Sequence, residues 1–130
     1  MSNNLDSIND WLDSLQESEF IPLSRRKIRL NTPFTDSFSD QISLLILLND
    51  DSTYTITDQG YTLWNIESRG ISLTQDKSPN LDSIKSILNT NQTQLSDTFE
   101  IYKKVPSGND IPAIKDVLIS IIEISNLSLS

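Results

Sequence analysis

Apolar residues recur every three to four positions in residues 4–17, the spacing of one face of an amphipathic helix. The apolar side of this segment consists of Leu5, Ile8, Trp11, Leu12 and Leu15. The opposite side carries acids at intervals of three or four residues, about 5 Å apart along the helix axis. These acids are Asp6, Asp10, Asp13 and Glu17. We therefore predict an N-terminal helix with a buried apolar face and an exposed acidic stripe.

The middle of the chain alternates between strand and turn patterns. The apolar run Ile42–Leu48 predicts a central strand covered on both faces, and Tyr54–Thr57 alternates as a half-buried strand does. The polar residues 49–52 between them predict a turn, so we expect the two strands to form an antiparallel hairpin. Asp58–Gly60 predicts a second turn, with positive φ at the glycine, and Leu63–Arg69 a short helix after it.

The remaining patterns complete an α+β fold. Ile28 and Leu30 predict a strand whose regular pairing ends at Pro33. A helix is expected to begin at Pro79, followed by a strand that contains Ile101. Residues 111–127 have the period of a helix. We predict one domain, a small antiparallel sheet of three to five strands with N-terminal, central and C-terminal helices packed on it. Its parts are the acidic helix (1–20), the sheet and helices (27–105) and the last helix (110–127).

The amino-acid composition excludes several kinds of catalytic and binding site. The 130 residues include no Cys and no His, so disulfides, the usual zinc sites, and Cys–His or Ser–His–Asp catalysis are excluded. With three Gly, neither glycine-rich phosphate-binding motif is present. No cofactor is predicted. The sequence shows no signal peptide and no long apolar run, which indicates a cytoplasmic protein without a membrane span.

The net charge is −8, from 18 acidic and 10 basic residues. This charge disfavours direct binding to nucleic acid or to an anionic membrane and favours a partner with a basic surface. A simpler interpretation is that the acids only solvate the surface. The basic cluster of Arg25, Arg26, Lys27 and Arg29 is short and has no interleaved aromatic residue, so it indicates an exposed strand start or pairing with the acidic helix.

Asp36, Asp40 and Asp58 form the best candidate cluster of carboxylates. Three such groups are able to hold Mg²⁺, but no lysine has the spacing that metal-dependent nucleases often use. The three residues are also interpretable as structural turn aspartates or as an acidic recognition patch. Further acids, Asp50 and Asp51, occupy the predicted hairpin turn, and Tyr61 is an aromatic candidate for an interface anchor.

The segment Thr32–Leu63 carries a more specific pattern. It starts with Thr32-Pro33-Phe34, has aspartates at 36 and 40 before the apolar strand, and ends in the Thr-Asp-x-Gly turn of residues 57–60 and a helix. The chain here resembles a phage and bacterial family known as domain of unknown function 1828, over about residues 28–124. The resemblance implies a protein of phages or mobile elements, without an assigned activity.

Three functions follow as hypotheses. The first is a non-enzymatic inhibitor of a host nucleic-acid-handling defence protein, such as a CRISPR effector, whose basic groove would bind the acids in place of phosphates. The second is a metal-dependent enzyme that uses the aspartate cluster, and the third is a component of a phage or regulatory assembly. The oligomeric state is left open. The candidate partner-binding residues are Asp6, Asp10, Asp13, Glu17, Asp36, Asp40, Asp50, Asp51, Asp58 and Tyr61.

Overall fold

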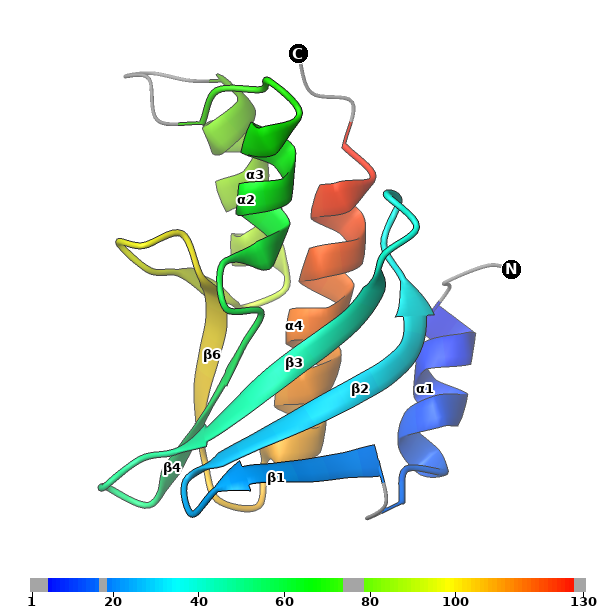
Figure 1. The fold of residues 1–130 in the computed structure, drawn as a ribbon, viewed down its shortest axis with the longest axis vertical. Coiled ribbons are helices and arrows are strands. Elements are labelled where there is room, and N and C mark those ends of the chain that lie inside the picture. The colour runs from blue at the N-terminus through cyan, green and yellow to red at the C-terminus, as the bar shows by residue number, and fades with distance from the viewer. Residues whose placement is uncertain (1–4, 17–18, 74–78, 128–130) are drawn as a thin grey trace.

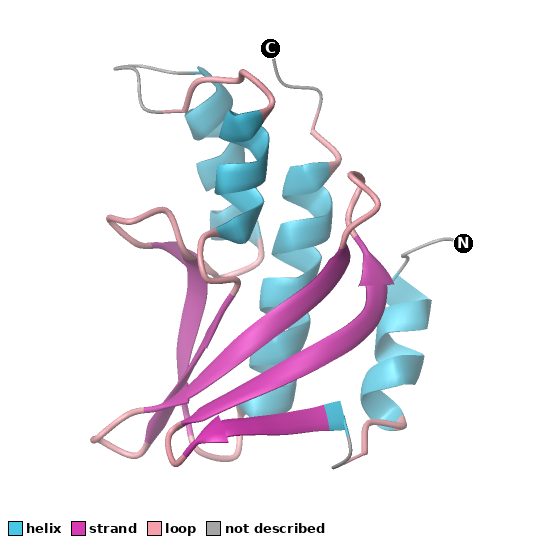
Figure 2. Ribbon diagram, viewed as in Figure 1, coloured by secondary structure: helices cyan, strands magenta, loops and turns pink. Residues whose placement is uncertain are grey.

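The computed structural model describes residues 5–16, 19–73 and 79–127 and contains one six-stranded antiparallel sheet (Figures 1 and 2). The strands lie in the order β1-β2-β3-β4-β6-β5. Their bounds are β1 Phe20–Ser24, β2 Lys27–Thr35, β3 Gln41–Leu48, β4 Thr53–Thr57, β5 Gln94–Leu95 and β6 Ile101–Pro106. The helices are α1 Leu5–Asp13, α2 Tyr61–Ser68, α3 Pro79–Thr90 and α4 Asp110–Ser125. The α+β class is confirmed.

The interior strand β3 lies where the sequence predicts it. Leu44 pairs with Leu30 of β2, and Ile46 pairs with Ile56 of β4, so one face of three strands is continuously apolar. This face packs against α4, which lies behind the sheet in Figure 1. On the other face Leu45 is buried, but Ser43 is exposed and Leu47 only partly buried, so this face is covered less completely than predicted.

Helix α4 is the centre of the packing. It contacts β4, β6 and each of the other three helices. Its apolar face is broad because buried residues recur along the whole helix, and Ile114, Val117, Leu118 and Ile124 have no exposed surface. One core cluster therefore joins the sheet to all four helices.

Two element boundaries differ from the prediction. The first helix ends at Asp13 instead of residue 17, and the Ser14 hydroxyl donates to the carbonyl of Trp11, a local bond that competes with further helix. Strand β2 continues past Pro33 to Thr35, because the pairing with β3 changes register between Asn31 and Thr35. The proline lies within this irregularity, where no ladder hydrogen bond is needed from it.

The sheet has more strands than the three to five expected. The additional strands are the two edges, β1 and β5. Four of the five β1 residues are exposed, so the segment lacks the alternation that marks a half-buried strand, and β5 is only two residues long. Within the described part of the chain, no helix combines the length and apolar character needed to cross a bilayer.

Candidate functional site

Asp58 joins three elements at the end of β4. One of its carboxylate oxygens accepts the backbone N–H groups of Gly60 at 2.8 Å and Ile101 at 2.9 Å. The other accepts the N–H of Thr62 in the first turn of α2 at 3.1 Å. Gly60 has φ 82°, as predicted for this turn. Burial raises the pKa of the Asp58 carboxyl, against the hydrogen bonds from the Thr62 side chain and from the backbone N–H groups, which lower it. Asp58 therefore fixes the entry to α2 and its distance from β6.

Asp36 organises the loop between β2 and β3. Its Oδ1 accepts the N–H groups of Phe38 at 2.9 Å and Asp40 at 3.1 Å. The loop is tied to the C-terminal end of α4, because the Ser37 N–H and hydroxyl donate to the hydroxyl and carbonyl of Ser125. The second oxygen, Asp36 Oδ2, accepts no hydrogen bond from any described residue. Asp36 is nevertheless only 8% exposed.

Asp40 connects this loop to α2. Its Oδ2 accepts the Tyr61 hydroxyl at 2.8 Å and the Asn65 side-chain amide at 3.0 Å. The hydrogen bond to this carboxylate raises the pKa of Tyr61, and the charge of Asp36 acts in the same direction. Two segments more than twenty residues apart in sequence are therefore held side by side by one carboxylate.

A cavity of about 730 Å³ lies between the start of β3, the Asp58–Gly60 turn and α2. Asp36 and Asp58 both line it, and Ile121 of α4 contributes to its apolar wall. Tyr61 and Trp64 also line it and are 44% and 61% exposed. Their ring centroids are 5.8 Å apart. The site thus combines an apolar hollow, buried carboxylate groups and an exposed aromatic pair.

The three aspartates of the predicted cluster are therefore neighbours but have different roles. Asp58 directs both oxygens to backbone N–H groups, and Asp40 directs Oδ2 to Tyr61 and Asn65. Across the described residues, no three acidic side chains are arranged to hold a metal ion.

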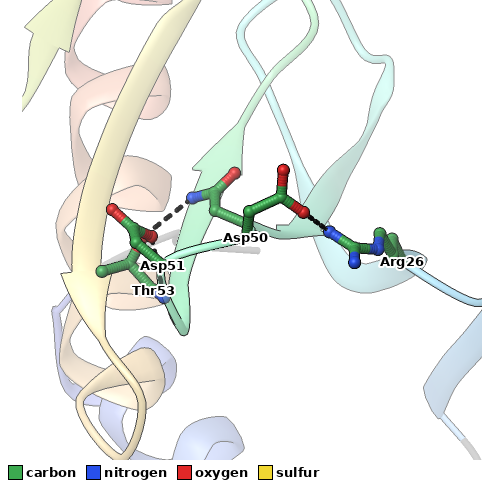
Figure 3. Close-up of polar contacts among 5 residues, drawn as sticks. Arg26, Asp50, Asp51 and Thr53 are labelled. Atoms are coloured by element: carbon green, nitrogen blue, oxygen red, sulfur yellow. Dashed lines mark hydrogen bonds and ion pairs between the residues drawn. The ribbon is translucent and has the colours of Figure 1, made fainter.

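The acids of the hairpin turn between β3 and β4 lie elsewhere (Figure 3). Asp50 pairs with Arg26, and Asp51 pairs with Lys104 at 2.9 Å. Asp51 also accepts the Thr53 hydroxyl. These contacts partly neutralise both acids within the chain itself.

The acidic stripe of α1 occupies a third region. Asp6, Asp10 and Asp13 are exposed, while Ile8 is buried and the Trp11 ring packs edge-on against Phe34 at 5.6 Å. Glu17, predicted as the last member of the stripe, lies outside the residues that the structure describes. In Figure 1, α1 and the β3–β4 turn lie on opposite sides of the molecule. The candidate acids thus form three separate groups, not one surface.

The family model for the domain of unknown function DUF1828 matches residues 32–124. The chain belongs to this family. The match confirms the resemblance, which was expected over about residues 28–124, from Thr32 to the last turn of α4. No curated protein and no solved structure matches the chain. The DUF1828 match contains the cavity and every residue that lines it, whereas α1 lies outside it.

Trp64 lines the cavity beside Tyr61. The sequence places it, with Tyr54 and Tyr61, among the aromatic residues near the acidic loops, interpretable as a half-buried position or as an interface anchor. In α2 the core positions are Leu63 and Ile66, so Trp64 lies one residue out of phase with them and faces outward with Tyr61. Gln41 was missed, because a polar residue at the first position of a strand has no distinctive pattern.

Proposed function

We propose that this DUF1828 protein is a non-enzymatic binding protein that captures a basic segment of a partner protein at the cavity beside α2. The observation that carries this function is the exposed pair Tyr61 and Trp64 at the rim of a hollow lined by carboxylates. Tryptophan and tyrosine are the residues most enriched among those that dominate the energy of protein interfaces. Contact of these apolar rings with water is unfavourable, so a partner that covers them would gain free energy.

The charge of the chain supports a basic partner. The net charge is −8, and Asp36, which lines the cavity, uses only Oδ1 as an acceptor among the described residues. Arg69 is the nearby cation, and it is already held over the Phe38 ring at 4.1 Å. Opposite charges across an interface accelerate association and help to select the partner.

We further propose that the protein comes from a phage or mobile element and that its partner is a host nucleic-acid-handling defence protein. In this form of the hypothesis, which includes CRISPR effectors as targets, Asp6, Asp10 and Asp13 of α1 fill a groove that otherwise holds phosphates. All three are exposed and make no ion pair with a described residue. This second surface is separate from the cavity, so the two are separable by mutation.

A metal-dependent enzyme and an assembly component have less support. Metal-dependent catalysis at this site needs free oxygens on Asp58, whose two oxygens accept three backbone hydrogen bonds. An assembly component needs an apolar helix face for docking. The apolar face of α4 is instead packed in the core of the described chain, and that of α1 packs against the core through Ile8, Trp11 and Leu12, although Leu5 is 51% exposed.

The test is affinity capture from a bacterial lysate with tagged wild type, Trp64→Ala and Asp10→Lys/Asp13→Lys, at low and moderate salt. We expect one partner to be recovered by the wild type at low salt, less at moderate salt, and not by Trp64→Ala. Leu23→Ala is the matched control, because Leu23 is an exposed apolar residue on β1 outside the cavity. Loss of capture only in the double lysine variant would favour the phosphate-mimicry surface. Equal recovery by all variants at both salts would overturn binding through either surface.

A further inference from the structure

We propose that the cavity recognises the guanidinium group of an arginine side chain, an inference that rests on the proposed function and specifies the partner's key residue. The occupant is an arginine-bearing segment of the partner protein. Three properties of the cavity lead to this ligand: its free hydrogen-bond acceptors, its aromatic rim and its volume.

The polar groups on the Asp36–Ser43 side of the cavity present acceptors. Asp36 uses Oδ1 for the Phe38 and Asp40 N–H groups, which leaves the charged Oδ2 for a ligand. Gln41 uses its Nε2 to donate to the Thr32 carbonyl at 2.8 Å, which leaves its Oε1. The Ser43 hydroxyl donates to Asn31 at 2.9 Å, so that its proton is also engaged. A ligand that fits this side of the cavity brings donors, together with positive charge for Asp36.

The rim favours a flat cation. Tyr61 and Trp64 have ring planes inclined at 34°, and both rings line the cavity. A guanidinium group stacks on aromatic faces and donates several N–H groups in its own plane, whereas an ammonium group does neither. The chain already uses this chemistry nearby, where Arg69 lies over the Phe38 ring and donates Nε–H to Asn65 Oδ1 at 3.3 Å.

Arg69 itself does not fill the site. Its guanidinium is engaged with Phe38 and Asn65, and it does not line the cavity. The volume of about 730 Å³ is within the range of about 300–1,000 Å³ that is typical of ligand pockets. It exceeds the needs of one guanidinium group, so the flanking residues of a partner segment also have room.

The experiment is an NMR titration of ¹⁵N-labelled protein with N-acetyl-arginine methylamide at millimolar concentrations. We expect saturable shifts at the Trp64 indole and at the amides of residues 36–41 and 58–62. The citrulline analogue has nearly the same shape without the charge and should bind at least tenfold more weakly. The lysine analogue should also be weaker, because it does not stack or form paired hydrogen bonds.

Two variants localise the effect. Asp36→Asn retains an Oδ1 acceptor for the loop N–H groups but presents an amide donor to the cavity, so affinity should fall at least tenfold with the fold intact. Trp64→Ala removes an exposed ring and should have a similar effect. Absence of saturable shifts, equal binding of citrulline or lysine, or unchanged affinity in both variants would overturn arginine recognition.

The outcome is independent of the capture experiment. Trp64-dependent capture of a protein without arginine binding would retain the proposed function and reject the arginine. Arginine binding without capture of any partner would retain the site and reject the proposed function in that lysate.

Discussion

At the scale of single residues, Asp58 shows how a carboxylate in a candidate cluster serves the fold. Asp58→Ala leaves three backbone N–H groups without their acceptor, on Gly60, Thr62 and Ile101. An unsatisfied buried donor costs about 1–3 kcal/mol, so we expect the free energy of unfolding to fall by about 3 kcal/mol or more. Urea denaturation measures this change.

Asp97→Ala is the control for Asp58, because Asp97 is an exposed acid in a neighbouring loop. Its effect should remain within about 0.5 kcal/mol. Asp58→Asn should fall between the two, since the amide oxygen still accepts from Gly60 and Ile101 but the amide nitrogen cannot accept from Thr62. Similar stability of Asp58→Ala and Asp97→Ala would contradict a structural role for Asp58.

Asp51 provides a prediction about pH. The hydrogen bond from the Thr53 hydroxyl, with a smaller effect of Lys104, lowers its pKa from 3.8 to about 2. Because the folded pKa lies below the unfolded value, the stabilisation is present above pH 3.8 and is lost as the pH falls towards 2. Thr53→Val removes the donor and should move the carboxyl pKa upward, as followed by the Asp51 ¹³C carboxyl signal. Thr53→Ser keeps a hydroxyl and should leave the pKa low. A low pKa in Thr53→Val would show that the hydroxyl is not the main cause.

At the scale of elements, the period of the hydrophobic residues predicted the helices and strands that have a face in the core. Strands β3 and β4 and helices α2, α3 and α4 lie where the sequence indicates, because each has a face that must be buried. The edge strands β1 and β5 were not predicted, since an edge is formed by pairing with a neighbour more than by its own pattern. Pro33 in β2 depends on an irregularity in the β2–β3 pairing, which no local pattern reveals.

The site could be predicted only in part, because local patterns identify its residues but not their tertiary contacts. Turn chemistry identified Asp36, Asp40 and Asp58, and the fold brings all three to the region between the β2–β3 loop and α2. The hydrogen bonds that distinguish them come from backbone N–H groups of distant segments, such as Ile101 on β6. Which carboxylate oxygen remains free is therefore a property of the tertiary structure.

At the scale of the whole molecule, the acids are distributed among α1, the β3–β4 turn and the cavity. A uniformly acidic surface would bind any basic partner. Three separate groups of acids can instead make separate contacts with a partner. The DUF1828 match contains the cavity and the β3–β4 turn but not α1. The match thus includes the proposed binding cavity and leaves out the acidic stripe of α1.

The packing around α4 predicts that the chain unfolds as one cooperative domain. Trp11 reports on α1 and its contact with Phe34, and Trp64 reports on α2, while both helices contact α4. In Trp11→Phe and Trp64→Phe, the remaining tryptophan's fluorescence should give the same urea midpoint as circular dichroism of the same variant. Leu118 is fully buried on α4, so Leu118→Ala should lower the free energy of unfolding by about 2–5 kcal/mol. The urea midpoints reported by the two tryptophans should therefore fall together. Separate transitions for the two tryptophans would mean that α1 and α2 belong to different folding units, despite the core they share.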